Sequence, residues 1–294
     1  MKRKFVFASL FLAASFQLAH AGSRMKHLSF YSADVHDTMK VVVLLPSNFD
    51  SSRSYPVLYL LHGYGGDQND WTKKTDLVQY TAGLPLITVM PEAKNSWYVN
   101  SQTNPKARYE GYMMHDLPRF IEKHFQIDTA RQAIAGLSMG GYGALMLALR
   151  HPGKFLFAGS LSGAITIPQI IDSVLSNPHF SMGKPQRGIF PNIVRTFGKD
   201  NKKFREEHNV FCLLSHDKPS SVPYLFIAQG IQDQFKEFLP ADHRFIDSLR
   251  VRGVRYEYHE LPGQHSWKFW NEEVRPMLRR MAKVMDLQEN PKGN

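Results

Sequence analysis

Short apolar runs alternate along the chain with longer amphipathic stretches. This alternation is typical of a mostly parallel sheet covered by helices. Several of the runs are apolar almost throughout, as strands buried on both faces must be. The predicted strands are residues 40–45, 57–61, 86–90, 132–137, 156–161, 224–229 and 255–261.

The amphipathic stretches predict four long helices, over residues 109–124, 142–151, 240–252 and 266–284. The third places Pro240 at its first position, where the missing N–H does no harm. Its apolar residues Phe245, Ile246 and Leu249 fall on one helical face. The order of strands and helices predicts one α/β domain over residues 22–294, which is ample length for a buried core.

One long insertion interrupts this rhythm. Residues 165–222 contain five prolines and scattered glycines, and they show no convincing strand. Long segments between strands are more often functional than idle. We therefore expect a cap-like insertion that lies over the strand ends.

The first 21 residues have the three parts of an export signal. Basic residues 2–4 precede an apolar run over residues 5–18, and Ala19-His20-Ala21 is a small-x-small cleavage site. The apolar run is shorter than the ~20 residues that a membrane-spanning helix needs. We predict a cleaved signal peptide and a secreted or periplasmic protein with no stable membrane insertion; an uncleaved anchor or a buried first helix is the alternative.

Charge and cysteine content narrow the function classes. Lys and Arg outnumber Asp and Glu by 36 to 26, and the formal net charge is +10. The positive residues occur as scattered pairs, whereas nucleic-acid binding needs them clustered on one face. We therefore expect no nucleic-acid partner. The single cysteine, Cys212, allows no internal disulfide and lies in an apolar run, so we interpret it as a small buried hydrophobe.

The most informative segment joins a predicted strand to a predicted helix through Gly136-Leu137-Ser138-Met139-Gly140. A serine that exposes its Oγ at the tip of a sheet must sit on a sharp, strained turn. Glycines on either side remove side chains that would collide there. The helix that follows supplies partial positive charge for a developing oxyanion. This context favours Ser138 as a nucleophile over a purely structural glycine-rich turn.

A serine nucleophile needs a base and an orienting acid, which follow it in this order in such folds: Ser, Asp or Glu, then His. His265 comes directly after the last predicted strand and is the candidate base. Asp233 follows the preceding strand and is the candidate acid. Asp242 is the alternative, although it falls in the first turn of a helix, where a carboxylate complements the helix dipole.

An oxyanion hole needs two N–H donors. The residue after the nucleophile, Met139, is expected to supply one. The loop after strand 57–61 is rich in glycine and is expected to supply the other, with Tyr64 as first choice and Gly63 as second. His62 more plausibly braces this loop than takes part in chemistry.

With these residues assigned, the chain resembles the esterase D / putative esterase family of α/β-hydrolases. The family includes S-formylglutathione hydrolases, feruloyl and acetyl esterases, and mycolyl transferases. The resemblance covers almost all of the mature chain, and it implies the triad Ser138, Asp233 and His265 with the N–H groups of Met139 and Tyr64 as the hole. It rests on residues 59–66 with Trp71, 95–98, Tyr109-Glu110 and 136–144, and on Gly230-x-x-Asp233-x-Phe235 and Gly263-x-His265-x-Trp267.

The resemblance leaves the substrate open. Trp97 and Tyr98, with Gly63, are candidate walls of the substrate pocket, although the two aromatic residues could equally plug the edge of the core. The insertion is expected to shape the leaving-group side. The formylglutathione hydrolases of this family look like enzymes of the cytosol, so an export signal counts against S-formylglutathione hydrolysis here.

The sequence therefore predicts an exported serine carboxylesterase that needs no metal or other cofactor. Its expected partners are small-molecule or carbohydrate-linked esters of short-chain or aryl acids, including acetyl and feruloyl esters. The alternatives are an S-formylglutathione hydrolase-type thioesterase and a mycolyl-transferase-like acyltransferase. A non-catalytic binding protein would be expected to have a degraded triad, whereas all three residues are present.

Overall fold

The computed structural model describes residues 24–177 and 184–287, and its centre is a single eight-stranded sheet. The predicted signal peptide lies outside the described residues. Across the sheet the strand order is β1-β2-β4-β3-β5-β6-β7-β8. The strands are β1 Met25–Ser32, β2 Asp37–Leu44, β3 Tyr55–Leu61, β4 Ile87–Pro91, β5 Ile127–Leu137, β6 Phe157–Leu161, β7 Tyr224–Gly230 and β8 Tyr256–Leu261.

The sheet is parallel from β4 through β8, while β1 and β2 are antiparallel additions at one edge. All seven predicted strands are present, and the prediction of a mostly parallel sheet is confirmed. The first strand, β1, was not predicted. It lies at the sheet edge, where its residues alternate between exposed and half-buried, so it lacks the continuous apolar run that marks the central strands.

Helices cover both faces of the sheet, as predicted. A short π-turn, η1 (Tyr112–Asp116), and a 3₁₀ turn, η2 (Pro219–Ser221), accompany them. The α-helices are α1 Asp70–Lys74, α2 Leu77–Tyr80, α3 Tyr109–Gly111, α4 Leu117–His124, α5 Met139–Arg150, α6 Gln169–Ser176, α7 Lys184–Phe197, α8 Lys202–Glu207, α9 Val210–His216, α10 Phe238–Arg252 and α11 Trp267–Val284.

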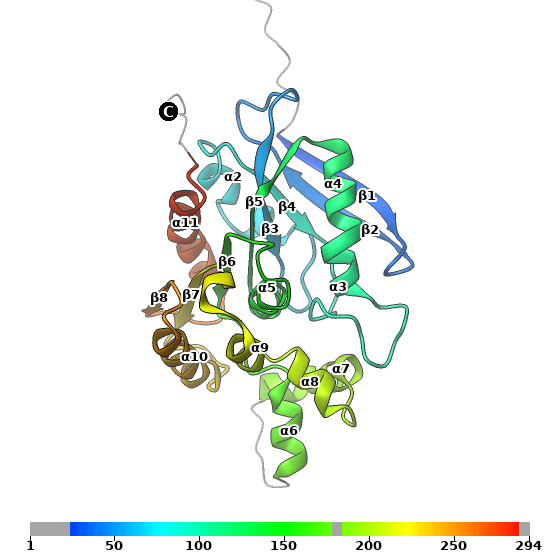
Figure 1. Cartoon of the computed structure of the whole chain (residues 1–294), viewed down its shortest axis with the longest axis vertical. Helices are drawn as coiled ribbons and strands as arrows, with labels where there is room; N and C mark the ends of the chain where they lie inside the picture. Colours follow the sequence, from blue (N-terminus) through cyan, green and yellow to red (C-terminus); the bar gives the residue numbers. More distant parts are fainter. Residues whose placement is uncertain (1–23, 178–183, 288–294) are drawn as a thin grey trace, which may run out of the picture.

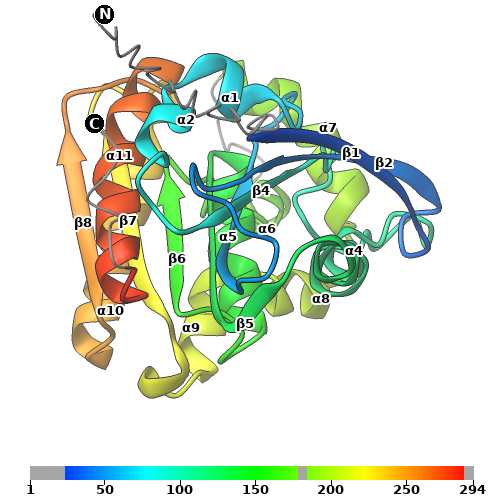
Figure 2. The ribbon, with the colours of Figure 1, turned by 90° about the horizontal axis from the view of Figure 1, so that it is seen from above.

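Two apolar cores lie on opposite faces of the sheet. One packs the strands against α4, α5, α9 and α10, with Leu145, Phe245 and Leu249 fully buried. The other packs them against α1, α2 and α11, with Trp71 and Met277 fully buried. Figures 1 and 2 show β8 and β7 beside α10 and α11 on one side of the molecule, and the β1–β2 pair at the other.

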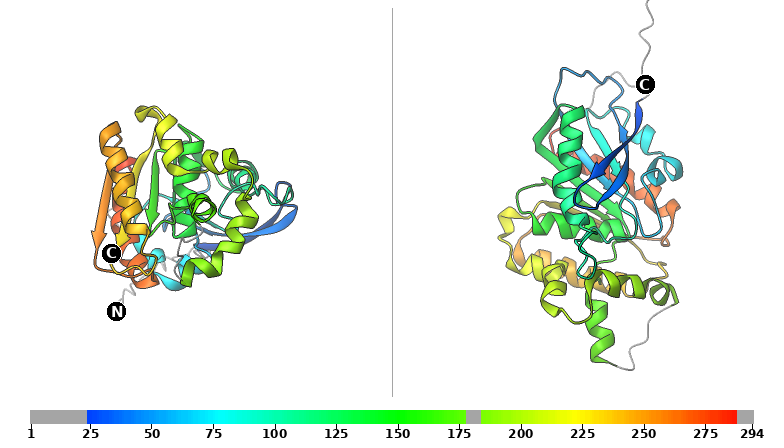
Figure 3. Two further views of the ribbon diagram at one scale, coloured as in Figure 1. Left: turned by 90° about the horizontal axis from the view of Figure 1, so that it is seen from below. Right: turned by 90° about the vertical axis from the view of Figure 1, so that its right-hand side faces the viewer.

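The insertion over residues 165–222 is helical rather than irregular. It contributes α6, α7, α8 and α9, and its described residues contain no strand, as predicted. Figure 1 and the right-hand view of Figure 3 show these helices gathered at one end of the molecule, with α6 projecting furthest. Cys212 lies in α9 and is half-buried, so the expectation of a buried side chain is wrong. Its partial burial still raises the pKa of its thiol.

The predicted helix over residues 109–124 is divided. It begins as α3, passes through the π-turn η1 and continues as α4. Pro118 is the second residue of α4. Proline lacks an N–H and clashes with the carbonyl four residues earlier, so a regular helix cannot run through this point. A π-turn absorbs the mismatch.

The helix that was predicted to begin at Pro240 begins at Phe238 instead. Pro240 still lies in the first turn, where a backbone N–H would have no acceptor within the helix.

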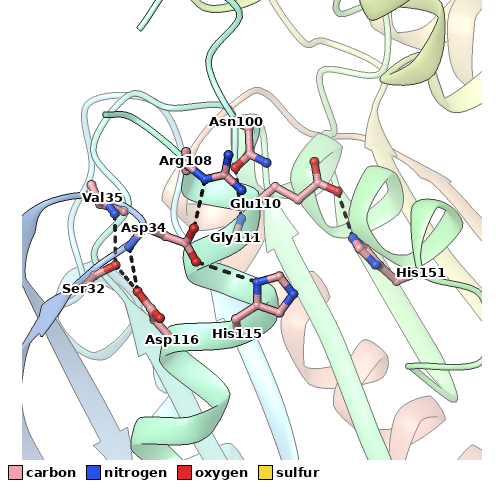
Figure 4. Close-up of polar contacts among 10 residues, drawn as sticks. All are labelled: Ser32, Asp34, Val35, Asn100, Arg108, Glu110, Gly111, His115, Asp116 and His151. Atoms are coloured by element: carbon pink, nitrogen blue, oxygen red, sulfur yellow. Dashed lines mark hydrogen bonds and ion pairs between the residues drawn. The ribbon is translucent and has the colours of Figure 1, made fainter. Parts of the chain in front are cut away.

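Polar contacts attach the β1–β2 turn to this divided helix (Figure 4). The Ser32 hydroxyl donates to Asp116 at 2.6 Å, and the Asp34 N–H donates to the same carboxylate at 3.0 Å. Arg108 in turn donates to the Asp34 carboxylate at 3.0 Å. These bonds hold the antiparallel edge of the sheet against the segment from Arg108 to Asp116.

Glu110 connects the same segment to the helix that follows Ser138. Its Oε1 lies 2.9 Å from Nε of Arg150 and 2.9 Å from Nε2 of His151, both at the end of α5 (Figure 4 shows the histidine). Its Oε2 lies 3.5 Å from Nε2 of His208, just after α8. Burial alone would raise the pKa of Glu110, but the hydrogen bond from His151, the nearby His208 and the Arg150 charge hold it well below its usual range.

We predict that Glu110→Gln destabilises the fold in a pH-dependent way. At pH 7 the free energy of unfolding should fall by about 3 kcal/mol, because the Glu110 side chain is only 8% exposed and breaking a buried ion pair leaves its partners unpaired. A carboxyl whose pKa is lower in the folded state stabilises the fold fully above its unfolded pKa of about 4.3 and progressively less below it.

Urea unfolding of the wild type and the variant at pH 7, 5 and 3.5 checks this prediction. Glu122→Gln, on the exposed side of α4, is the matched control and should change little at any pH. A wild-type-minus-Glu110→Gln difference that stays constant across these pH values would contradict the proposed linkage.

Candidate active site

Ser138 lies on a sharp turn between β5 and α5. Its backbone has φ 52° and ψ −115°, a region that non-glycine residues rarely occupy and that is associated with functional strain. The two glycines of the motif are required by contact. A Cβ on Gly136 would meet the Gly140 oxygen at 2.5 Å, and a Cβ on Gly140 would meet the carbonyl oxygens of Leu61 and His62 at 2.6 Å.

His265 and Ser138 are brought together as the sequence predicts. Nε2 of His265 lies 2.8 Å from the Ser138 Oγ, and Nδ1 lies 2.8 Å from Oδ2 of Asp233. The His265 side chain is 9% exposed, so it is largely shielded but still faces the cavity. Three aromatic rings surround the imidazole, with centroids 4.9–5.8 Å away: Phe235, Phe238 and Trp270.

Asp233 lies on the loop after β7, and its side chain is only 3% exposed. Both carboxylate oxygens accept further hydrogen bonds. The Phe235 N–H donates to Oδ1 at 2.8 Å, and Nε2 of Gln229 donates to Oδ2 at 3.1 Å. Together with His265 these donors fix the plane of the carboxylate. Sequence reasoning did not single out Gln229, because its role depends on where its amide points.

Asp242 does not complement a helix dipole, and that interpretation is wrong. It is the fifth residue of α10, its side chain is fully buried, and its Oδ2 has no hydrogen-bond partner among the described residues. Burial, followed by the nearby charges of Asp233 and Glu260, raises the pKa of Asp242 well above its usual range. The carboxyl that contacts His265 is that of Asp233.

The two candidate oxyanion donors flank Ser138. Met139 is the first residue of α5, where a backbone N–H has no acceptor within the helix. The Tyr64 N–H has no hydrogen-bond acceptor in the part of the chain that the structure describes. Gly63 and Tyr64 both line the cavity next to Ser138. The loop therefore presents a free N–H at the site, as an oxyanion hole requires.

His62 holds this loop in place. Its Nε2 accepts the Ala93 N–H at 3.0 Å, so Nδ1 carries the proton and donates to the Gly63 carbonyl at 2.8 Å. Burial lowers the pKa of His62, which keeps the ring neutral and suits this pattern of one acceptor and one donor. Asn95 adds a second brace, since its Oδ1 accepts the Gly65 N–H at 2.6 Å.

The two aromatic residues predicted to line the substrate pocket have different positions. Trp97 lines the cavity and its ring centroid lies 6.0 Å from that of Tyr64. Tyr98 is fully buried and does not line the cavity; its hydroxyl donates to the His62 carbonyl at 2.9 Å. The expectation that Tyr98 contacts substrate is therefore corrected: it supports the loop from the core, which is the alternative interpretation of this pair.

The cavity at Ser138 has a volume of about 250 Å³. Aromatic side chains make up a large part of its wall, among them Trp97 and Trp267, and Ile189 of α7 brings the insertion to it. Sequence analysis missed the polar corner at Lys74, whose ammonium lies 2.7 Å from Asp70 and 4.9 Å from the Trp267 ring centroid. Such a small, mostly apolar space suits a short acyl group better than a long one.

Two other features of the described residues bear on function. No group of three or more His, Cys, Asp or Glu side chains in residues 24–177 and 184–287 is arranged to hold a metal ion. Within the same ranges, none of the helices combines the length and the apolar character that crossing a bilayer requires.

Comparison with known proteins gives several related esterases. The acetyl esterase of Caldicellulosiruptor saccharolyticus is 28% identical over 273 residues, covering 88% of this chain and 98% of that enzyme. An esterase of Mycobacterium tuberculosis is 37% identical over 265 residues, which is 83% of this chain but 56% of that longer protein. The S-formylglutathione hydrolase of Mus musculus is 27% identical over 290 residues, covering 90% of this chain and 95% of that enzyme.

Solved structures share the fold. The fluorophosphonate-binding serine hydrolase F of Staphylococcus aureus superposes with a TM-score of 0.70 at 24% identity, covering 89% of this chain and 98% of that one. A ferulic acid esterase gives 0.70 at 22% identity, covering 88% and 98%. The fold is thus the α/β-hydrolase fold. The family described as "Putative esterase" matches residues 32–281, so the chain belongs to this family and is a carboxylic ester hydrolase.

Proposed function

We propose that the protein is an exported serine carboxylesterase that hydrolyses short-chain or aryl acyl esters through an acyl-enzyme on Ser138. The observation that carries the proposal is the continuous hydrogen-bonded chain from Ser138 Oγ through His265 to Asp233, at the wall of a cavity. The names of the acetyl esterase and ferulic acid esterase relatives support acetyl and feruloyl esters, including esters of carbohydrates, as substrates.

The first step transfers one proton and forms one bond. The Asp233 carboxylate accepts the Nδ1–H of His265, which leaves a lone pair on Nε2 directed at the Ser138 hydroxyl. Nε2 takes the hydroxyl proton as Oγ attacks the ester carbonyl carbon. Asp233 holds the imidazole in the required tautomer and stabilises the imidazolium that forms.

The negative charge that develops on the carbonyl oxygen would lie between the N–H groups of Met139 and Tyr64. Each such donor is typically worth about 3–4 kcal/mol in the transition state. The N-terminus of α5 adds the partial positive charge of the helix dipole at the same place. The His62 and Asn95 braces keep the Tyr64 donor in position, so little reorganisation is needed during the reaction.

The second half of the reaction reverses the proton path. The imidazolium gives its proton to the leaving alcohol as the tetrahedral intermediate collapses to the acyl-enzyme. Water then attacks the acyl carbonyl while His265 removes its proton, and the acid leaves as Ser138 regains its hydroxyl hydrogen. Every proton moves between Ser138, His265, substrate and water, so the sequence of steps requires no cofactor.

A thioesterase of the S-formylglutathione hydrolase type is the second candidate, because one relative over nearly the whole chain carries that name. The same residues would perform that reaction with a thiolate leaving group. An acyltransferase with a long lipid donor is less well supported, since the cavity volume of about 250 Å³ leaves little room for a long chain.

Export remains a proposal that rests on the pattern of residues 1–21. Fractionation of the native cells, followed by N-terminal sequencing of the recovered protein, tests it. A mature N-terminus near Gly22 in the periplasm or medium is the expected result, and full-length protein in the cytoplasm would refute export.

Ser138→Ala should abolish turnover of p-nitrophenyl acetate, with kcat falling by about six orders of magnitude, as is typical when such a nucleophile is removed. Covalent labelling by a fluorophosphonate probe should disappear as well. Ser215→Ala, on an exposed part of α9, is the matched control and should keep both activities. Labelling that persists in Ser138→Ala would refute the nucleophile assignment.

Substitution of the two carboxyls should separate their roles. Asp233→Asn should lower kcat by about 10⁴-fold, because an amide no longer fixes the His265 tautomer. Asp242→Asn should keep kcat close to wild type and should raise the free energy of unfolding at pH 7, since the raised pKa of Asp242 makes folding progressively less favourable above its unfolded pKa of about 3.9. Steady-state kinetics and urea unfolding measure both; a larger loss of kcat in Asp242→Asn would reverse the assignment.

Acyl length should be restricted by the cavity. In a p-nitrophenyl ester series, kcat/KM should be highest for acetate to butyrate and should fall by about tenfold or more at octanoate, since overfilling a packed site costs about 1–3 kcal/mol. Methyl ferulate and S-formylglutathione in the same assay compare the aryl and thioester alternatives. A kcat/KM that rises steadily with chain length would contradict the short-chain proposal.

A further inference from the structure

A second cavity, of about 370 Å³, lies beside the catalytic one and has no part in the mechanism above. The loop between β4 and α3 forms one wall and α7 of the insertion forms the other. Its volume falls within the range of ligand sites in proteins. Most of its lining residues carry a hydroxyl or an amide, in contrast to the aromatic side chains at Ser138.

The two cavities share their structural supports. On α7, Ile189 lines the catalytic cavity, while Asn192 and Arg195 line the second one. Ile189 and Asn192 are three residues apart and lie on one helical face, so their Cβ atoms are about 5–6 Å apart and the two cavities are neighbours. The indole N–H of Trp97, which lines the catalytic cavity, donates to Asn192 at 2.7 Å.

The second cavity presents mainly donors. Three asparagines line it, and each uses its Oδ1 to accept an N–H of the protein: Asn95 from Gly65 at 2.6 Å, Asn104 from Lys106 at 3.1 Å, and Asn192 from Trp97 at 2.7 Å. These bonds fix the orientation of the amides, because a carbonyl oxygen must face each donor. The three NH₂ groups have no acceptor within the described residues and are left for a ligand.

The charge of the cavity also favours a ligand that carries hydrogen-bond acceptors. No Asp or Glu is among its described lining residues. Lys94 is already paired with Asp37, whereas the exposed Arg195 guanidinium has no carboxylate partner within residues 24–177 and 187–287. An unpaired arginine beside amide donors is suited to a carboxylate, which it can bind through two parallel N–H···O bonds.

We propose that this second cavity binds an acidic sugar residue, of the uronic acid class, in a carbohydrate whose ester is held at Ser138. This inference rests on the proposed esterase function and names its substrate class. The uronate carboxylate pairs with Arg195, and the sugar oxygens accept from the asparagine NH₂ groups. Because the two cavities share α7 and the Trp97–Asn192 contact, the esterified sugar and the acidic sugar would be near neighbours in one chain.

The test compares two acetylated xylo-oligosaccharides of equal length, one with and one without a uronosyl residue. Wild-type kcat/KM should be about threefold to fivefold higher for the acidic substrate, mainly through KM, as an ion pair with an exposed arginine allows. Arg195→Ala should reduce this ratio to near one. Arg119→Ala, an exposed arginine on α4, should keep it. Asn104→Ala should weaken the binding of both oligosaccharides a few-fold.

A binding measurement keeps the test independent of turnover. Calorimetry with Ser138→Ala should give a lower Kd for the acidic than for the neutral oligosaccharide, and adding Arg195→Ala should remove the difference. Equal binding of the two, or a preference that survives Arg195→Ala, overturns the acidic-sugar site. An Arg195-dependent preference for S-formylglutathione over both sugars overturns it in favour of a peptide carboxylate. Absence of p-nitrophenyl acetate hydrolysis in the wild type would instead overturn the esterase proposal itself.

Discussion

The turn at Ser138 holds a serine at a positive φ of 52°, a conformation that costs about 1–3 kcal/mol and persists only where the surrounding structure dictates it. Here the carbonyls of Leu61, the last residue of β3, and of His62 after it lie so close to Gly140 that no Cβ fits there. The Ser138 N–H donates to the Leu161 carbonyl of β6 at 2.9 Å. Neighbouring strands on both sides of β5 therefore fix the direction of the Ser138 side chain.

The same packing fixes the other parts of the site. Asp233 and His265 follow β7 and β8, and the Gln232 N–H donates to the Gly263 carbonyl at 2.9 Å, so the two loops are held together. On the other side of Ser138, the neutral His62 ring ties the glycine-rich loop to Ala93 after β4. Because parallel strands end at one edge of the sheet, residues far apart in sequence meet there without long connections.

Sequence patterns predicted the parts that depend on burial and on motif order. The central strands are apolar throughout because both faces are covered, and the Ser–Asp–His order follows the strand ends. What the patterns missed depends on three-dimensional contacts. β1 is half-exposed and so carries a weak pattern, the π-turn arises where Pro118 meets a helix already begun, and the burial of Asp242 is set by the packing of α10 on the sheet.

The second cavity was beyond sequence reasoning for a more specific reason. Asparagine offers both a donor and an acceptor, and only the structure shows which atom the protein itself uses. In Asn95 and Asn192 the acceptor is taken by the residues that build the catalytic cavity, Gly65 and Trp97. The bonds that position the catalytic wall are thus the ones that leave the NH₂ groups of two residues lining the second cavity free to donate. A ligand bound by these amides would therefore contact the same two side chains that hold Gly65 and Trp97 in place at the acyl site.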